Sequence, residues 1–597
     1  MPLPRLSRKL TAVVAVLTAA TAVVAAAVAL TDTVTTGTGG GTLAERAARE
    51  GVLIINNNAE PVSLDPHAVS GAIDLRVAGA LFEGLLANDP RTLAPVPAAA
   101  ESHTVSPDGL THTFRLRENL RWADGRPLTA GDFLFSFRRV LSPRLAAPNA
   151  AQFFVVKNAR AFHEGREPDF ARTGFSAPDA RTVRFELEHP CANFADLVCH
   201  PAWAPVPRHV IEKFGDFDAP GLPWTRPGTI TGNGPFRLAA WRVADRIEVV
   251  RNPRYWNAAA VRLNAVRFLA ISDLQAEERA FRGGLLHITS TVPPLKVARC
   301  RRAEDGGPLR LDPFFSTTFV RVNTAAAPLA DPRVRRALSL ALRRAEIAAN
   351  VMRAGETPAF CLTPPVAGGY VCAARLREDP AEARRLLAEA GYPGGRGFPT
   401  LTYLYNNHET SRLIAQAMQE MWRATLGIRV ELQSQEWKTY KAALAAGTYQ
   451  LARSAWSGDT LDARAFLDLF ESRSEQNQTN WRDPAYDADL AAAARAPDAA
   501  SRDAACQRAE ARLLDALPVL PLVHNRNKFL IRPEVRGWFP NPLDIHPLSA
   551  VWLEPAPAKS PAISRAAYRE STAGNSATNS AGGGASAAKT HCRPPCE

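Results

Sequence analysis

The chain has 597 residues, of which 46% are hydrophobic and 22% are charged. This length exceeds what one hydrophobic core usually serves, so we expect two or three lobes, and the composition excludes a mainly disordered protein. The net charge of +12 does not indicate a nucleic-acid-binding protein, because the basic residues are scattered through helical patterns that also carry Glu and Asp. We therefore expect no nucleic acid among its partners.

The N-terminal segment has the pattern of an export signal. Three basic residues within positions 5–9 precede an uncharged stretch of Ala, Val and Leu at 10–30. The small residues Ala27-Val28-Ala29 suit a signal peptidase, although the stretch is also long enough to remain as a membrane anchor. We prefer cleavage, so residues 1–30 are predicted to be a signal peptide or, alternatively, an anchor. No cysteine precedes Cys191, which excludes a lipid-modified N-terminal cysteine.

The segments that flank the predicted fold have low-complexity composition. Residues 31–47 begin with the Gly/Thr-rich tract TDTVTTGTGGGT and are predicted to form a flexible linker. Residues 556–597 are rich in Ala, Ser and Gly and are predicted to be a disordered tail. This tail ends in HCRPPCE, which is more typical of a disulfide or free thiols than of a zinc site with four ligands. We therefore predict no metal and no cofactor.

Between these ends, strand and helix patterns alternate along the chain. Residues 51–55, 113–117 and 246–250 have the β-branched or alternating pattern of strands. The clearest helices are predicted at Pro332–Ala349 and Pro380–Ala390, each opened by Asp-Pro, and Gly391 follows the second in the expected C-terminal position. The pattern indicates an α/β chain without an internal repeat.

The chain has eight cysteines, which in an exported protein favour disulfides. Two pairs are close enough in sequence to close local loops, namely Cys191 with Cys199 and Cys361 with Cys372, while Cys300 and Cys506 have no obvious partner. Spacing alone leaves the pairing open.

Several motifs follow one another between residues 50 and 555. They are EPVSLDPH at 60–67, LFEGL at 81–85, the long stretch AESHTVSPDGLTHTFRLRENLRWADGRPLTAGDFLFSFRRV at 100–140, GNGPF at 232–236, RNPRYWN at 251–257, LADPRVRRA at 329–337 and LLAEAGY at 386–392. Together they resemble the family 5 extracellular solute-binding proteins, the receptors of peptide-type ABC importers. The stretch 430–455 is most similar to the oligopeptide receptors of the Gram-negative periplasm.

The resemblance implies an α/β, two-lobed periplasmic-binding-protein clamshell (type II, cluster C-like) with an extra domain. The implied boundaries are 48–82, 206–309 and 526–555 for lobe I, 83–205 for the extra lobe II, and 310–525 for lobe III. The ligand cleft is expected between lobes I and III.

The resemblance also implies a ligand site around RSAWSGDTLDA, residues 453–463. A peptide receptor must neutralise an amine and a carboxylate, because an unpaired buried ion costs several kcal/mol. Asp459 falls on the position that resembles the amine-binding aspartate, and Arg453 on one that approaches the peptide's C-terminal end. The main chain of Ala455 and Ser457 is expected to pair with the peptide as an added strand.

Further residues belong to the predicted site. Trp437 is expected to line a side-chain pocket, the lobe I side is expected at residues 68–72, and the full set is Asp459, Arg453, Trp437, Ala455, Trp456, Ser457, Gly458, Ser70 and Ala72. The structural alternative is that Asp459 caps the following helix and Arg453 forms an ordinary surface ion pair. Asp462 has the pattern of a helix-start acid.

The chain also departs from the enteric oligopeptide receptors at four positions. Ser316 and Ser457 stand where those receptors carry a bridging cysteine pair, Leu444 replaces an arginine near the cleft, and Asn149 replaces a tyrosine. The lining is therefore less basic and less aromatic, which leaves peptide length and the carboxylate contact open.

We therefore predict a periplasmic, monomeric receptor that captures short peptides and delivers them to an inner-membrane ABC permease. We predict that it is not an enzyme, since the sequence has no G-x-S-x-G elbow, P-loop or H-E-x-x-H motif. The alternatives are the same fold binding a murein-derived peptide or another solute, an envelope-tethered sensor, and a peptide hydrolase.

Overall fold

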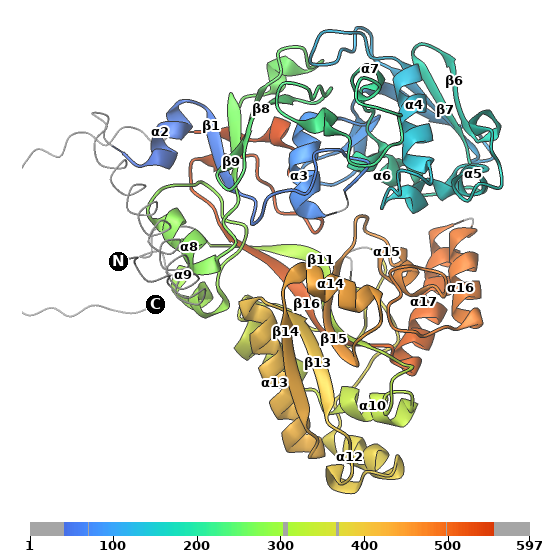
Figure 1. Ribbon diagram of the computed structural model, residues 1–597, viewed down its shortest axis with the longest axis vertical. Helices are drawn as coiled ribbons and strands as arrows, with labels where there is room; N and C mark the ends of the chain where they lie inside the picture. The colour runs from blue at the N-terminus through green and yellow to red at the C-terminus, as the bar shows by residue number, and fades with distance from the viewer. Residues whose placement is uncertain (1–40, 70, 302–308, 366–368, 497, 555–597) are drawn as a thin grey trace, which may run out of the picture. The chain divides into compact units, whose positions relative to one another are not determined.

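The computed structural model describes residues 41–69, 71–301, 309–365, 369–496 and 498–554 (Figure 1). The predicted signal segment 1–30, most of the predicted linker, Ser70 and the tail 556–597 lie outside the described residues. No helix within the described ranges is both long and apolar enough to cross a membrane.

The first lobe is built on a four-stranded sheet in the order β1-β10-β9-β8. β1 runs parallel to β10, and the other neighbours are antiparallel. The strands are β1 (Val52–Asn56), β8 (Phe236–Arg242), β9 (Arg246–Arg251) and β10 (Ala265–Leu269), with the pair β17 (Val535–Arg536) and β18 (Trp552–Leu553). The helices are α2 (Leu43–Arg49), α3 (Ala72–Leu81), α7 (Arg208–Ile211), α8 (Leu274–Arg282) and α9 (Val297–Cys300).

The second lobe has an antiparallel sheet in the order β4-β5-β7-β6 and a small hairpin, β2-β3. The strands are β2 (Leu86–Asn88), β3 (Pro95–Pro97), β4 (Ala100–Val105), β5 (Thr111–Leu116), β6 (Phe175–Asp179) and β7 (Thr182–Glu186), and the helices are α4 (Ala130–Leu141), α5 (Ala159–His163) and α6 (Phe194–Val198). The apolar side chains of α4 and of this sheet share one core that is rich in aromatic rings.

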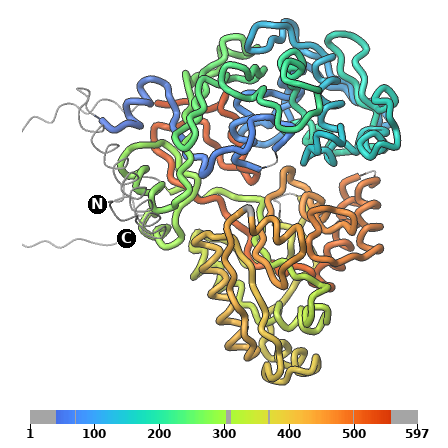
Figure 2. Tube along the Cα trace, viewed as in Figure 1, coloured from blue at the N-terminus to red at the C-terminus, as the bar shows by residue number. Residues whose placement is uncertain are grey.

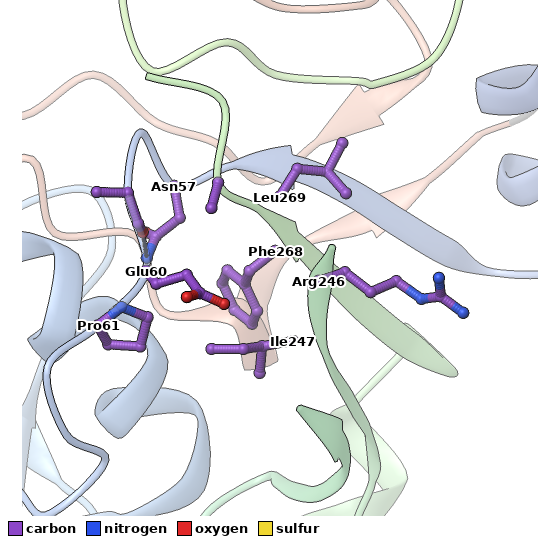
Figure 3. A pocket seen from close by; sticks show the side chains of 9 residues that line it. Asn57, Glu60, Pro61, Arg246, Ile247, Phe268 and Leu269 are labelled. Carbon is purple, nitrogen blue, oxygen red and sulfur yellow. Dashed lines mark hydrogen bonds between the residues drawn. The ribbon is translucent and has the colours of Figure 1, made fainter. Parts of the chain in front are cut away.

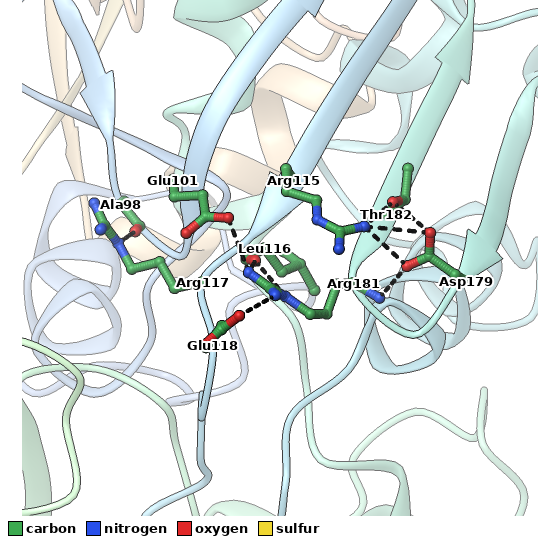
Figure 4. Close-up of polar contacts among 9 residues, drawn as sticks. All are labelled: Ala98, Glu101, Arg115, Leu116, Arg117, Glu118, Asp179, Arg181 and Thr182. Carbon is green, nitrogen blue, oxygen red and sulfur yellow. Dashed lines mark hydrogen bonds and ion pairs between the residues drawn. The ribbon is translucent and has the colours of Figure 1, made fainter.

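Ion pairs connect residues of this sheet with residues of the loops between its strands (Figure 4). Arg181 binds Glu118 at 2.7 Å and Glu101 at 2.8 Å, and its Nε donates to the carbonyl oxygen of Leu116 at 3.0 Å. Arg115 on β5 reaches Asp179 at 3.3 Å. These charges satisfy one another, so this part of the long matching stretch is scaffold.

The third lobe is built on a six-stranded mixed sheet in the order β12-β16-β11-β15-β13-β14. The strands are β11 (Leu309–Val322), β12 (Thr357–Pro358), β13 (Leu401–Asn406), β14 (Val430–Gln435), β15 (Leu451–Ser457) and β16 (Val519–Leu530). The helices are α10 (Pro332–Leu340), α11 (Arg344–Glu346), α12 (Pro380–Glu389), α13 (Glu409–Leu426), α14 (Trp437–Ala445), α15 (Arg464–Leu467), α16 (Pro484–Ala494) and α17 (Ala499–Ala516).

β11 and β16 run side by side over most of their length (Figure 2). The far end of β16 reaches the first lobe, because Leu530 accepts a hydrogen bond from the Thr289 main chain at 3.0 Å and donates to the Thr289 hydroxyl at 2.8 Å. Most core residues cluster within single predicted lobes, with members at 85–203, at 53–82 with 204–288 and 529–551, and at 315–523. A further core crosses the predicted boundary, because it joins Ala354 of the third lobe to first-lobe residues such as Val52, Phe281 and Leu530. The division into three lobes with these bounds remains a prediction.

Two local predictions were wrong. Residues 43–47, assigned to the flexible linker, belong to helix α2, which is started by a capping box between Thr42 and Glu45. The predicted helix 332–349 ends at Leu340, and a second helical turn begins at Arg344. The break has a tertiary cause, because the buried Arg344 side chain donates to the carbonyl oxygens of Ser339 and Pro521.

Candidate ligand-binding site

The strand β15 has a main-chain edge that no described strand covers. It pairs with β11 along its whole length but with β13 only at Leu451 and Ala452. The Gly458 N–H donates to β11 at 3.0 Å, and main-chain groups alternate between the two edges of a strand. The N–H and C=O groups of Ala455 and Ser457 therefore face the uncovered edge.

One side chain marks where this uncovered edge begins. The Tyr440 hydroxyl, from α14, donates a hydrogen bond to the carbonyl oxygen of Arg453. Ala455 and Ser457 lie beyond that contact, and Ser457 is exposed. Sequence reasoning included Tyr440 in the matching stretch but did not assign it to the site, since only the folded contact shows that it ends the covered part of β15.

Asp459 follows the strand and is exposed. Among the described residues it has no hydrogen-bond or ion-pair partner, so it does not cap α15. The acid at the start of that helix is Asp462, which accepts a hydrogen bond from the Arg464 main chain at 2.9 Å, as its pattern indicates. The Asp459 charge also acts on the half-buried His200, whose pKa is lowered by desolvation against the opposing effect of Asp459.

Arg453, in the middle of β15, is half-buried. Its Nε is buried without a hydrogen-bond partner, and no carboxylate of the described residues forms an ion pair with it. Burial lowers the pKa of the neighbouring His408, and the Arg453 charge lowers it further. The surface ion pair expected from the structural alternative is thus absent from the described part of the chain.

Among the other predicted residues of the β15 region, Trp437 is exposed, whereas Trp456 and Gly458 contact other residues of the third lobe. The Trp437 indole stacks on Tyr440 with ring centroids 5.7 Å apart. Trp456 turns the other way, since its indole N–H donates to the Ala465 carbonyl at 2.8 Å. Gly458 packs so closely on Phe315 that a Cβ would lie 2.6 Å from the ring.

The predicted lobe I side lies at the start of α3. Ala72 is exposed as the first residue of this helix, while Ser70 lies outside the described residues. The buried side-chain amide of Asn149 donates to the Val69 carbonyl at 2.8 Å and holds this segment. Apart from the buried Gly458, the predicted site residues that the structure describes are exposed or half-buried, and their joint contact with a ligand remains a prediction.

The positions that depart from the enteric receptors also have clear places. Ser316 and Ser457 lie directly opposite each other on β11 and β15, as expected for positions that a cysteine pair bridges in other members. Leu444 is buried in a small cluster with Tyr440 and Tyr449 behind β15.

The second and third lobes touch beside this site. The Asn193 side-chain amide lies 3.3 Å from the Asp462 carboxylate, which also pairs with Arg502 at 3.2 Å. These contacts position the acid next to Asp459.

Two hollows lie elsewhere and include none of the predicted site residues. One, of about 190 Å³, is lined by Glu60, Phe268 and neighbouring residues of the first lobe (Figure 3). In it Glu60 accepts a hydrogen bond from the Ala244 main chain at 3.0 Å. The other, of about 270 Å³, is bordered by the ion pair of Arg76 with Asp544 at 3.2 Å.

Comparisons with known proteins agree with this architecture. Residues 94–478 match the model of the bacterial extracellular solute-binding proteins, family 5 Middle. The periplasmic oligopeptide-binding protein OppA of Escherichia coli (strain K12) is 34% identical over 518 residues, which cover 85% of this chain and 92% of OppA. The chain therefore belongs to the family 5 extracellular solute-binding proteins, as predicted.

Solved structures show the same fold. The Escherichia coli murein tripeptide binding protein MppA superimposes with a TM-score of 0.78 and 33% identity, covering 84% of this chain and 98% of MppA. Haemophilus influenzae OppA in complex with RPPGFSPFR gives 0.77 and 33%, covering 84% of this chain and 99% of that chain. The predicted α/β binding-protein fold with two lobes and an extra domain is confirmed.

Proposed function

We propose that this chain is an extracytoplasmic receptor that binds short peptides and delivers them to an ABC permease. The single observation that carries the proposal is the uncovered edge of β15 at Ala455 and Ser457, flanked by the charges of Arg453 and Asp459. Its family, and the peptide ligands named for similar proteins, support this reading. Binding and release require no covalent chemistry, so the proposal includes no enzymatic activity.

The main chain of the peptide would form the strand that β15 lacks. Ala455 and Ser457 each offer one N–H donor and one C=O acceptor, which match the groups of an extended peptide whatever its sequence. Main-chain pairing therefore provides affinity without side-chain selectivity. Trp437 would contact a peptide side chain, since its exposed indole offers an apolar wall.

The two charges would set the direction and ends of the peptide. Asp459 would pair with the α-amine and Arg453 with a carboxylate, because neither has an opposite charge among the described residues. An ion pair at about 4 Å recovers about 4 kcal/mol at an effective dielectric constant near 20. This gain offsets the desolvation of the peptide termini.

The test is a cycle of two proteins and two ligands. Wild type and Asp459→Asn are purified from a periplasm, identified peptides are taken from native mass spectra, and one peptide is titrated with a free and with an acetylated amine. We expect at least a tenfold loss of affinity on either change alone and little further loss when both are combined, because both remove the same ion pair. Asp245→Asn, an exposed acid of the first lobe, is the control and should bind as wild type.

Other results would redirect the proposal. If Asp459→Asn retains the co-purified peptides, the function holds and the amine site is wrong. An empty wild type that ignores peptides favours a murein-derived or non-peptide solute, and cleavage of a labelled peptide indicates a hydrolase. The mature N-terminus distinguishes a released periplasmic receptor from an anchored sensor, and light scattering tests the proposed monomer.

A further inference from the structure

Helix α17 holds the main chain on both sides of Cys372. The Gln507 side chain accepts a hydrogen bond from the Ala373 N–H at 2.7 Å and donates to the Val371 carbonyl at 2.7 Å. One amide thus fixes the residues before and after the cysteine. The position of the Cys372 sulfur is therefore set by a side chain of α17, whatever state the sulfur is in.

The next turn of the same helix holds Cys361. Glu510 accepts hydrogen bonds from the main chain of Leu362 and Thr363, both at 2.8 Å, and from the Tyr370 hydroxyl at 2.7 Å. Residues three apart on a helix share one face, so Gln507 and Glu510 bring the two cysteine-bearing segments to one place. The Leu376 N–H closes the arrangement by donating to the Phe360 carbonyl at 2.8 Å.

The two sulfurs meet inside the third lobe. Cys361 and Cys372 are 1% and 2% exposed, and their sulfurs and a Glu510 oxygen all lie within 4.8 Å of one another. The Cys361 sulfur lies 3.3 Å from the Thr363 carbonyl oxygen and 3.9 Å from His524 Nε2, and the Cys372 thiol donates to the Ala374 carbonyl oxygen at 3.3 Å. The segments that carry the two thiols are held mainly by the hydrogen bonds of Gln507 and Glu510.

A metal ion explains this cluster less well than a bond between the sulfurs. Three donors gather here, while a structural zinc site takes four. The nearest imidazole nitrogen, of His524, lies 3.9 Å from the Cys361 sulfur, and the Arg375 guanidinium, a cation, donates to that sulfur at 3.4 Å. A metal cation would be repelled by this arginine, but a neutral disulfide would not.

We propose that Cys361 and Cys372 form a disulfide in the mature protein. The inference rests on the extracytoplasmic location in the proposed function, because disulfides persist in oxidising compartments. Each thiol loses one hydrogen atom and the two sulfurs join, while the two electrons and two protons reduce the disulfide of an external oxidant to two thiols. The reaction takes place before the loop packs, since the folded structure buries both sulfurs.

The bond would strengthen the support of the ligand strand. Thr317, opposite Trp456 on the neighbouring β11, donates its hydroxyl to the Leu362 carbonyl at 2.7 Å. Leu362 follows Cys361 directly, so a crosslink there fixes the segment that backs β11. Ser316 and Ser457 leave the β11–β15 pair without a covalent bridge, and the proposed bond lies on the other side of β11.

The first experiment maps the sulfurs in the full chain. Protein isolated from a periplasm is alkylated under denaturing conditions and digested without reductant. We expect a peptide pair joined through Cys361 and Cys372, lighter by two hydrogen atoms than the two thiol peptides and absent after reduction. Recovery of both cysteines as alkylated thiols, or zinc held by the thiols and lost to a chelator, would overturn the proposal.

The matched variants are Cys372→Ser and Cys199→Ser. Both thiols donate to a main-chain carbonyl at 3.3 Å, so each substitution removes a comparable contact. Reductant should lower the melting temperature of wild type and of Cys199→Ser by a few degrees and leave Cys372→Ser unchanged, because a loop of this length is stabilised by its crosslink. An equal response of all three would contradict the pairing.

A redox titration separates this inference from the proposed function. The purified chain is reduced and unfolded, then refolded in mixtures of oxidised and reduced glutathione, and the linked peptides are quantified. A pair that forms in the buffer but is absent from protein isolated from its own cells supports the pairing and overturns the extracytoplasmic location. Peptide binding is measured on the same samples, so loss of one property does not imply loss of the other.

Discussion

Two regions of the molecule combine an aspartate with an arginine in opposite ways. Asp65 binds Arg139 at 2.6 Å in a buried network, where Asp65 also accepts from the Trp224 indole at 3.3 Å. On β15 and just after it, Arg453 and Asp459 have no ion-pair partner among the described residues. The same residue types thus serve the scaffold in one region and remain available in the other.

The difference suggests a criterion for this chain: a structural charge has its opposite charge within the protein, whereas a ligand-binding charge does not. Burial raises the pKa of Asp65, but the Arg139 guanidinium outweighs burial and holds that pKa below its usual value. The first region is therefore complete without a ligand. In the proposed complex, the amine and carboxylate of the peptide supply the opposite charges that the second region lacks.

The largest expected effect is the loss of stability when the buried Asp65–Arg139 ion pair is broken. Asp65→Asn leaves the buried Arg139 without its counter-charge and should lower the free energy of unfolding by about 3–5 kcal/mol, measured by denaturant unfolding. Asp216→Asn is the matched control, because its ion pair with Arg144 is 2.7 Å long but exposed, and its loss should lower the free energy of unfolding far less. Equal losses would show that burial does not distinguish the two pairs.

The second effect is a pH dependence that comes from the same network. His67 accepts from Arg139 at Nδ1 and lies 3.1 Å from the Ala204 carbonyl through Nε2, and burial and Arg139 lower its pKa to about 4. An unfolded histidine binds a proton below about pH 6.5, whereas the folded one stays neutral, so stability falls as the pH falls between these values. The loss should reach about 2.5 kcal/mol near pH 4.5.

The measurement compares denaturant unfolding of wild type and His67→Gln near pH 7.5 and near pH 4.5. The variant should lose less stability on acidification by about 2.5 kcal/mol, because glutamine has no proton to gain. Burial also lowers the pKa of His112 and His287 to about 4, but those residues are unchanged in both proteins. Parallel pH curves would remove His67 from this role.

Much of the scaffold could be predicted because it depends on local chemistry. Asp331 and Asp379 each cap the helix that follows an Asp-Pro pair, and Gly391 has a φ of +97° after the second helix. The short helix α2 was missed although its capping box, Thr42 and Glu45, is visible in the sequence. The Gly/Thr-rich tract before it led to the prediction of a linker.

The proposed site was only partly predictable because its main feature is a strand edge that no described strand covers. The family resemblance named Ala455 and Ser457, but only the strand order shows that β13 leaves their edge uncovered. Likewise, the spacing of Cys361 and Cys372 left their pairing open, and the contacts with Gln507 and Glu510 come from a helix more than 130 residues away. Long-range contacts of this kind have no signal in a single sequence.

A smaller effect, on peptide affinity, is expected from a change at Arg453. Arg453→Met should weaken the binding of a peptide with a free carboxylate about tenfold and leave a peptide amide unaffected, measured by calorimetry. Its effect on stability should be slight, since the guanidinium has no ion-pair partner in the described part of the chain. Arg144→Met, which lies on the second lobe, serves as the charge-matched control. An equal loss for acid and amide would place the carboxylate elsewhere.

The smallest effect links the two regions through Asn149. Asn149→Ala removes the donor to the buried Val69 carbonyl and should cost about 1 kcal/mol of stability. If residues 68–72 contact the peptide, the loosened segment should also weaken peptide binding a few-fold, whereas the Asp216→Asn control should not. Unchanged affinity with reduced stability would assign Asn149 to the scaffold alone. The expected result would mean that Asn149 acts on peptide binding through the segment 68–72 that it holds, without contacting the peptide itself.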